Sequence, residues 1–505
     1  MKYLLAHDLG TSGNKATLYT VEGQLVKSIV YPYTTYYFNG NWAEQDADDW
    51  WKAVCQTTKE ILKGIDSDDV AVVSFSGQMM GCLCVDRDGK PLRRSIIWAD
   101  QRAVREMNEV KEKIGADRFY KITGHPISVS YSLQKLMWIK NNEPEIYSNT
   151  YKILNAKDYI IYKLTGRYVT DYSDGSGTNM VDLEKLEWSD EIITTMGIDG
   201  DKLPELREST YVAGNVTREA ADATGLSQDT LVVCGGGDGV CAAIGAGCIK
   251  PGVTYNVIGS SSWISLTTEN PIYDSRMRTF NWAHIVPGYF LPCGSMQAAG
   301  VSYSWLKNVI CTGEAAEAEK LGISPYQLMD GEAEKTPAGA RGLIFLPYLL
   351  GERSPWWNPN ARGAFIGLTA AHRREDMIRA VLEGITLNLN VILDVFRQHA
   401  DIKEVIAIGG GARGKFWRQI MADVYGLKIL KPNYLEEATS MGAAITGGVG
   451  VGIYKNFDVI DRFIRIEEEH LPTEENHRIY QELMPVFEES YNSLVSIYEK
   501  LSALG

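Results

Sequence analysis

Short apolar segments separated by turns rich in glycine and asparagine open the chain. The first three, YLLAHDLG, KATLYT and QLVKSIVYPY, are joined by the polar turns TSGN and VEG. Apolar runs of this length, with such residues between them, are typical of neighbouring antiparallel strands. The sequence therefore predicts an antiparallel three-stranded meander within residues 3–33.

The same order of strand, glycine and hydroxyl turn, and strand returns in the second half of the chain. Two segments look like copies of one motif: LGTSGNKATLY near the N-terminus and IGSSSWISL after residue 257. The repetition predicts two related halves, and we place the boundary where the second copy begins, near residues 249–253. The predicted domains are residues 1–248 and 249–505.

Helical patterns fill much of the space between these strands. The pattern predicts a helix over residues 46–63, a mostly helical segment over residues 102–192, and a charged amphipathic helix from about residue 458 to 504. Residues 404–426, EVIAIGGGARGKFWRQIMADVYG, predict a buried strand, a glycine loop and an amphipathic helix.

Composition and charge narrow the class of protein. The 505 residues are 45% hydrophobic and carry a formal net charge of −14, which disfavours a nucleic acid or an anionic membrane surface as the main partner. No run of 18 apolar residues is present, so we expect no membrane span. The eight cysteines are scattered through apolar segments and predict reduced, buried thiols in a cytoplasmic protein.

The segment LVVCGGGDGVCAAIGAG, residues 231–247, combines an apolar run, three glycines, an aspartate and a stretch of small residues. It predicts a buried strand, a tight turn and a helix that packs closely against a neighbour. Asp238 lies at the junction. Its carboxylate suits either the N-cap of that helix or a catalytic base, and the segment alone leaves both open.

The turn in HDLGTSGNK offers groups that bind phosphate. Its backbone amides, the hydroxyls of Thr11 and Ser12, and the charge of Lys15 suit phosphate oxygens, and Asp8 suits a hydrated magnesium ion. An ordinary hairpin turn is the alternative. The second copy has the same donors without a charged residue, at Gly259, Ser260, Ser261 and Ser262.

A third glycine loop, at Gly409 to Gly411 with Ala412, leaves open backbone against which a nucleoside could lie. A common turn between a strand and a helix has the same sequence character. Together the three loops suggest that a nucleotide with its phosphate tail is bound between the two halves.

Several segments together carry a family resemblance: HDLGTSGNKATLY, SFSGQMMG, IIWADQRA, CGGGDG, IGSSSW, LPYLLGERSPWWNP, SYSLQKLMWIKNN, GAFIGLTAAHRREDMIRAVLEGI and IGGGARGKFWRQIMADVYG. In order and spacing they resemble the FGGY family of carbohydrate kinases, and within it the xylulokinases most. The resemblance runs from residue 2 to about residue 455.

This resemblance implies two actin-like, ribonuclease H-like α/β ATPase domains, with ATP and a sugar in the cleft between them. It implies that Asp238 is the catalytic base, that Asp8 lies at the magnesium ion with Asp238, and that the two hydroxyl turns hold the phosphates. Gly410, Gly411 and Ala412 would lie at the adenosine.

The resemblance also predicts a sugar site, with two departures. Gln78, Met79 and Met80 stand where xylulokinases have Gln-Met-His, so Met80 lacks the imidazole donor, and Gly239 stands where they usually have Asn. Asp100 and Arg102 either bind sugar hydroxyls or form a structural ion pair. Asp171, Asp174 and Ser176 either line the cleft or shape an Asx-type turn.

The resemblance implies an ATP-dependent kinase that phosphorylates a terminal hydroxyl of a ketopentose, with D-xylulose as the first expectation and with ATP and Mg²⁺ as cofactors. The alternatives are a kinase for another sugar, polyol or aldonic acid, and a non-catalytic sugar or nucleotide sensor on the same fold. A homodimer is possible, because the C-terminal helix suits either a dimer contact or cover for its own domain.

Overall fold

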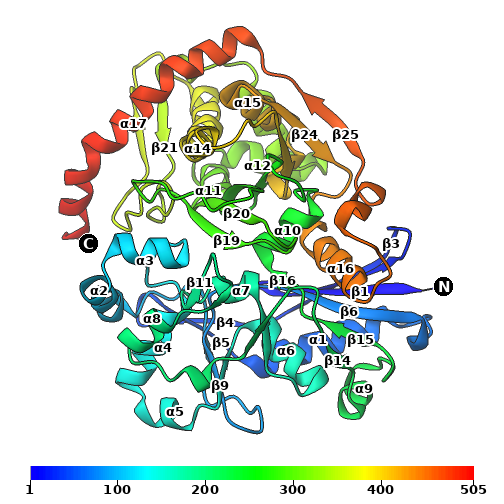
Figure 1. Ribbon diagram of the computed structural model, residues 1–505. Coiled ribbons are helices and arrows are strands. Elements are labelled where there is room, and N and C mark those ends of the chain that lie inside the picture. The colour runs from blue at the N-terminus through cyan, green and yellow to red at the C-terminus, as the bar shows by residue number, and fades with distance from the viewer. Residues whose placement is uncertain (1, 505) are drawn as a thin grey trace.

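Each half of the chain builds one seven-stranded mixed sheet in the computed structural model, which describes residues 2–504 (Figure 1). The N-terminal sheet has the order β14 (Val212–Asn215), β15 (Leu231–Val233), β6 (Val70–Gly77), β1 (Tyr3–Leu9), β2 (Gly13–Thr20), β3 (Leu25–Pro32), and β16 (Gly236–Gly237) also pairs with β6. The predicted meander is confirmed, since β1, β2 and β3 pair antiparallel.

The C-terminal sheet repeats this plan. Its order is β19 (Phe280–Ala283), β20 (Phe290–Met296), β18 (Ser262–Leu266), β17 (Thr254–Ile258), β23 (Glu404–Ile408), β24 (Lys428–Pro432), β25 (Ile466–His470). In each sheet the first strand of the meander also pairs in parallel with a later strand, on the side away from the rest of the meander. β1 pairs in this way with β6, and β17 pairs with β23. The two related halves are thus present in three dimensions.

Two helices of small residues lie between the sheets, α10 (Asp238–Gly245) and α16 (Ala438–Gly450) (Figure 1). They pack against each other closely because glycines stand at the contact. A Cβ atom added at Gly442 would lie 1.9 Å from the carbonyl oxygen of Cys241, and one at Gly245 would lie 1.8 Å from that of Ala438. The predicted small-residue helix, expected over residues 242–247, is confirmed for residues 242–245, but α10 already begins at Asp238 and ends at Gly245.

Other helices cover the outer faces and fill the cores. In the N-terminal domain they are α1 (Ala47–Ile61), α2 (Val104–Lys113), α3 (Ala116–Thr123), α4 (Ser132–Asn142), α5 (Pro144–Asn149), α6 (Ala156–Thr165), α7 (Tyr172–Ser176), α8 (Asp190–Thr195) and α9 (Arg218–Thr224). In the C-terminal domain they are α11 (Gly300–Val309), α12 (Thr312–Leu321), α13 (Pro325–Ala333), α14 (Arg374–Arg397), α15 (Lys415–Tyr425) and α17 (Glu474–Ser502).

The remaining strands are short and lie outside the two seven-stranded sheets. They are β4 (Thr35–Phe38), β5 (Trp42–Gln45), β7 (Leu83–Val85), β8 (Ser95–Ile96), β9 (Lys152–Leu154), β10 (Val169–Asp171), β11 (Val181–Asp182), β12 (Glu187–Trp188), β13 (Glu205–Arg207), β21 (Ile344–Leu346) and β22 (Ala364–Ile366). The mostly helical segment predicted over residues 102–192 therefore includes the short strands β9 to β12, of which β11 and β12 pair with each other. Residues 458–473 also differ from the prediction, because β25 adds an edge strand there and the terminal helix begins only at Glu474.

The cysteines and the helices agree with two further expectations from composition. All eight cysteines are free, and all except Cys55 are buried. No helix within residues 2–504 combines the length and apolar character that crossing a membrane requires.

Candidate active site

Two cavities lie where the predicted loops converge. The interdomain cavity, of about 120 Å³, is lined from both domains by Met79, Met80, Trp98, Asp238, Gly239, Ser261, Trp263, Phe280, Trp282, Cys293, Ser295, Met296, Gln297 and Arg353. The glycine-lined cavity, of about 820 Å³, lies within the C-terminal domain and is lined by Ile258, Gly259, Ser260, Gly300, Val301, Tyr303, Ser304, Ser324, Tyr326, Gln327, Asp330, Gly410, Gly411, Arg413, Gly414 and Trp417.

Asp238 is the first residue of α10, and Gly237 occupies the N-cap position. The N-cap alternative is therefore wrong, and the carboxyl group is free to face the interdomain cavity. Its Oδ1 accepts a hydrogen bond from the backbone N–H of Gly239 at 2.8 Å. Burial in the cleft and, to a smaller extent, the negative charge of Asp8 together raise the pKa of Asp238 to about 7, against the smaller opposing effects of the Gly239 amide and Arg353.

Asp8 reaches the same edge of the sheet for a topological reason. It is paired in register with Ser76 of β6, and Gly236 pairs with Ser76 from the other side, so the strand ends that carry Asp8 and Asp238 flank β6. The Ser76 hydroxyl donates to Asp8 Oδ1 at 2.9 Å. Burial raises the pKa of Asp8, although Ser76 and Lys15 act in the opposite direction.

The first hydroxyl turn borders the cleft. Thr11 Oγ1 accepts a hydrogen bond at 2.8 Å from the indole of Trp98, which lines the interdomain cavity, and Ser12 is exposed. Lys15 Nζ donates to the carbonyl oxygen of Glu436 at 2.9 Å, and the Glu436 carboxylate pairs with Arg413 at 2.8 Å. These contacts connect the first turn to the third glycine loop across the two domains.

The second turn borders both cavities. Gly259 and Ser260 line the glycine-lined cavity, whereas Ser261 lines the interdomain cavity beside Asp238. The turn is closed by a hydrogen bond from Gly259 N–H to the carbonyl oxygen of Ser261 at 2.9 Å. A group held by this turn is therefore placed between the two cavities.

The third loop supplies open backbone, as predicted for two of its three residues. Gly410 and Gly411 line the glycine-lined cavity, and a side chain at Gly411 would collide with Ile258, whose Cγ2 would lie 2.3 Å from an added Cβ atom. Ala412 requires a correction. It is fully buried in the core of the domain and does not belong to the cavity wall, because its methyl group turns inward on the short helical turn of residues 410–413.

The predicted sugar residues at positions 78–80 differ in their exposure to the cavity. Met79 and Met80 line it, whereas Gln78 is buried and donates through Nε2 to Gln45 Oε1 at 2.6 Å. Met80 has a φ of +64°, a left-handed backbone conformation that residues other than glycine rarely adopt. Its carbonyl oxygen accepts a hydrogen bond from the buried ammonium of Lys135 at 2.7 Å, which holds the turn in place.

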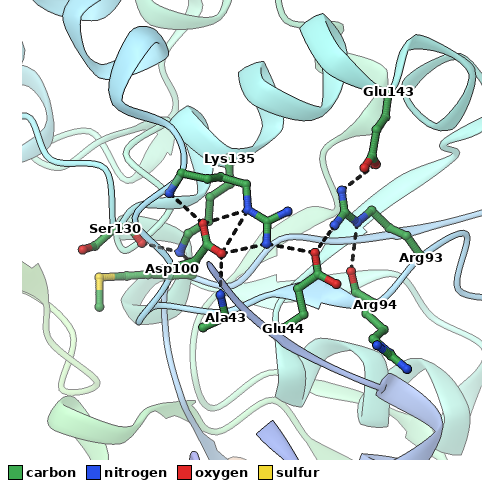
Figure 2. A network of polar contacts seen from close by, with 10 residues as sticks. Ala43, Glu44, Arg93, Arg94, Asp100, Ser130, Lys135 and Glu143 are labelled. Carbon is green, nitrogen blue, oxygen red and sulfur yellow. Dashed lines mark hydrogen bonds and ion pairs between the residues drawn. The ribbon is translucent and has the colours of Figure 1, made fainter. Parts of the chain in front are cut away.

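Asp100 and Arg102 form a buried ion pair outside the cavity wall. Figure 2 shows Asp100 in the network of polar contacts that includes Ala43 and Glu44. Arg102 Nη2 lies 2.7 Å from Asp100 Oδ2 and 2.9 Å from Glu44 Oε1, and its guanidinium lies 3.9 Å from the centroid of the Trp42 ring. Asp100 Oδ2 also accepts from the backbone N–H of Ala43 at 2.6 Å. The structure favours the structural ion pair for these two residues, because Asp100 and the Nε and Nη2 atoms of Arg102 already have protein partners and neither residue lines the cavity.

The Asx-type turn is likewise the alternative that the structure supports for Asp171. Its side chain accepts hydrogen bonds from the backbone N–H groups of Ser173 and Asp174, and it lies 2.8 Å from Lys157 Nζ. The hydroxyl of Ser173 in turn accepts a hydrogen bond from the N–H of Gly237 at 3.0 Å. This buried cluster supports the glycine turn that carries Asp238.

Comparisons with known proteins agree with this arrangement over the whole chain. The models of the N-terminal and C-terminal domains of the FGGY family of carbohydrate kinases match residues 3–245 and 254–451. The chain belongs to the FGGY family of carbohydrate kinases. It is an enzyme that transfers phosphate to a sugar, and the kinases of this family use ATP.

Individual relatives of the kinase cover nearly its full length. It is 34% identical to the gluconokinase of Bacillus licheniformis, over 99% of this chain and 98% of the relative, and 35% identical to a xylulose kinase of Staphylococcus epidermidis, over 97% and 96%. The solved xylulose kinase of Lactobacillus acidophilus superposes with a TM-score of 0.92 at 30% identity, covering 99% of this chain and all of that one. The gluconate kinase of the same organism gives a TM-score of 0.91 at 29% identity and covers 99% of both chains. The predicted pair of actin-like domains is confirmed.

Three charged residues of the kinase site or its support gave no signal in the sequence: Arg353, Glu352 and Lys135. Arg353 lines the interdomain cavity, and Glu352 accepts hydrogen bonds from the backbone N–H groups of Arg353 and Gln297 at 2.8 and 2.7 Å. Lys135 holds the Met80 turn. The segments LPYLLGERSPWWNP and SYSLQKLMWIKNN contain these residues, but only tertiary contacts separate their charges from those of solvated side chains.

Proposed function

We propose that the kinase transfers the γ-phosphate of ATP to the terminal hydroxyl of a ketopentose, D-xylulose, and produces D-xylulose 5-phosphate. The observation that carries this proposal is the position of Asp238. Its carboxyl group lines a small cavity between the domains, has a pKa near neutrality, and lies beside the turn that borders the glycine-lined cavity.

In this mechanism Asp238 accepts the proton of the acceptor hydroxyl as the oxygen attacks the γ-phosphorus, and ADP leaves. A base with a pKa near 7 is half ionised at neutral pH and is basic enough to assist that transfer. Phosphoryl transfer otherwise depends on positioning and charge neutralisation. The hydroxyl turns at Thr11 and Ser12 and at Ser260 and Ser261 would hold the phosphate oxygens.

The glycine-lined cavity suits the nucleoside of ATP. Gly410 and Gly411 present backbone without side chains, and Tyr303 and Trp417 add aromatic surface to the same wall. Because Gly259 and Ser260 border this cavity and Ser261 borders the other, a phosphate tail that starts at the nucleoside would point toward Asp238.

Asp8 and Asp238 fit a hydrated magnesium ion. Burial raises the pKa of both carboxylates, and neither forms an ion pair with a lysine or arginine within residues 2–504. Mg²⁺ commonly retains several waters and uses one or two protein carboxylates together with phosphate oxygens. When bound, the ion would neutralise charge on the phosphates.

A second acceptor class, the aldonic acid gluconate, is supported by a specific observation. Arg353 places a cation in the wall of the interdomain cavity, where a carboxylate could pair with it. The gluconokinase relatives have the same degree of identity as the xylulose kinases. Met80, in place of the histidine of xylulokinases, removes a donor for a sugar hydroxyl.

The deciding experiment is an ADP-release assay with magnesium and ATP across pentuloses, hexuloses, polyols and aldonic acids, with the Asp238→Ala protein as the blank. We expect strong turnover on D-xylulose. Turnover on gluconate alone would keep the mechanism and change the acceptor. No turnover on any compound, with ATP still bound, would contradict the proposal and favour the sensor.

A further inference from the structure

Arg353 lies in the loop between β21 and β22 of the C-terminal domain and reaches the interdomain cavity. Its guanidinium carbon lies 5.6 Å from the centroid of the Trp98 ring, which belongs to the N-terminal domain. The side chain therefore spans the cleft and stands against the wall of the N-terminal domain that contains Met79 and Met80.

The guanidinium of Arg353 lies near the Trp98 ring and has no partner with which it forms a hydrogen bond or an ion pair among residues 2–504. The residue is half-buried in the cavity wall, and this burial lowers its pKa. The buried Arg379, in contrast, donates to Glu383, to the carbonyl oxygen of Thr336 and to the hydroxyl of Tyr480. Burial of an unpaired cation is costly unless a ligand completes its hydrogen bonds.

The main chain at Arg353 is held firmly in contrast. Glu352 Oε1 accepts from the backbone N–H of Arg353 at 2.8 Å and from that of Gln297 at 2.7 Å, and its Oε2 accepts from Asn388 at 3.2 Å. A fixed backbone with an unpartnered head group is the arrangement expected of a preorganised ligand-binding side chain.

Electrostatic neighbours place Arg353 on the acceptor side of Asp238. The charge of Arg353 acts on Asp238 and on Tyr131, whereas the cation that acts on Asp8 is Lys15 of the first phosphate turn. Lys15 thus faces the predicted phosphate side and Arg353 faces the acceptor. The rest of the acceptor wall is largely apolar, with Met79, Met80, Trp98, Trp263, Phe280 and Trp282.

We propose that Arg353 is a specificity-determining residue that donates paired hydrogen bonds to two neighbouring oxygen atoms of the acceptor, away from the hydroxyl that Asp238 deprotonates. This inference rests on the proposed kinase function. A guanidinium is a planar donor without acceptors, so it selects a paired set of oxygen acceptors. The carboxylate of an aldonic acid and the adjacent carbonyl and hydroxyl oxygens of a ketose both provide such a pair.

The test uses the full chain with Arg353→Met and Arg353→Lys, each also in an Asp238→Asn background that binds the acceptor without turnover. Isothermal titration gives the Kd of D-xylulose, of gluconate and of ATP, and steady-state kinetics give KM and kcat. We expect Arg353→Met to weaken the binding of the accepted substrate by at least about 30-fold and to change the Kd of ATP less than about threefold.

Arg353→Lys separates the two oxygen pairs. Lysine keeps the charge but loses the planar fork, so it should restore much of the binding of a carboxylate and little of the binding of an uncharged ketose. Arg362→Met, at an exposed arginine of the same loop, is the matched control and should leave both constants unchanged. If Arg353→Met fails to fold, as judged by its melting temperature, the Arg353→Lys protein supplies the comparison.

An unchanged acceptor Kd in Arg353→Met would overturn the inference. So would a loss of kcat with an unchanged acceptor Kd, since Arg353 would then act on the transferred phosphate. Failure of the proposed function has a different signature, because the wild-type kinase would then turn over neither D-xylulose nor gluconate. If another acceptor is turned over, the same titrations are made with that compound.

Discussion

Two aspartates of the N-terminal domain, Asp100 and Asp238, differ most in how their oxygen atoms are occupied. Asp100 accepts hydrogen bonds from Ala43 N–H, Arg102 N–H and the Arg102 guanidinium, and all of these partners are buried with it. Asp238 has one backbone donor, Gly239, and its nearest acidic neighbour, Asp8, repels it. The first carboxylate has protein partners and the second is left for a ligand and a proton.

The comparison teaches how to separate structural from functional charge in this kinase. A charge whose partners are complete contributes to the fold, and removing one partner leaves the other unpaired in the protein interior. A charge left incomplete in a cavity is destabilising unless a substrate or cofactor completes it. Among the cations, Arg102 forms ion pairs with Asp100 and Glu44, whereas Arg353 forms none within residues 2–504.

The largest effect is expected on catalysis, when the carboxylate of Asp238 is removed. Asp238→Ala should lower kcat about 10³-fold, because the acceptor hydroxyl loses its base, while the Kd of the acceptor changes far less. Steady-state kinetics and titration measure the two constants. Asp229→Ala, at an exposed aspartate before β15, is the control and should retain full activity. A residual rate within about tenfold of wild type would show that Asp238 is not the base.

The second largest effect is expected on stability, when the carboxylate of Asp100 is removed. Asp100→Asn should lower the free energy of unfolding by about 2 kcal/mol, because the buried Arg102 guanidinium loses the carboxylate that binds both its Nε and Nη2 atoms and keeps only Glu44 as an ion-pair partner. Urea unfolding measures this change, and Asp100→Asn combined with Arg102→Met should recover part of it. An unchanged stability together with a raised acceptor KM would instead place both residues at the sugar.

The pH dependence of kcat/KM tests the role of Asp238, with an expected decrease of about tenfold per pH unit on the acid side. Below a pKa of about 7 the Asp238 carboxyl is protonated and cannot accept the hydroxyl proton, so kcat/KM should fall as the pH decreases from 7 to 5. Asp8→Asn removes the neighbouring negative charge and should move this acid limb to lower pH. An acid limb that stays at the same pH in Asp8→Asn would contradict the coupling of the two carboxylates.

The smallest effect concerns the wall of the acceptor cavity. Met80→His should keep D-xylulose activity or lower its KM a few-fold, because imidazole restores a donor to a hydroxyl. The left-handed conformation at this position also disfavours histidine less than most residues. The KM for D-xylulose measures the outcome, with Met79→Leu as a packing control. Complete loss of activity would show that Met80 serves a different acceptor.

The sequence by itself determined the meander of residues 3–33, its second copy after residue 253, and the loops that carry Asp8, Asp238 and Gly410. These features follow from local patterns, since strand periodicity and glycine turns depend on the backbone. The order of the motifs was also sufficient to identify the family. Prediction was less successful where an edge strand, β25, replaced the start of the terminal helix, because pairing with β24 overrides a local helical preference.

Only the tertiary structure decided which charged residues are functional candidates. The sequence left open whether Asp100 and Arg102 bind the sugar or form an ion pair, and their partners Ala43 and Glu44 come from a distant strand. Arg353, Glu352 and Lys135 carried no local signal, because their significance lies in which atoms surround them after folding. Pairing and burial depend on contacts between segments far apart in the chain, and these contacts exist only in the folded protein.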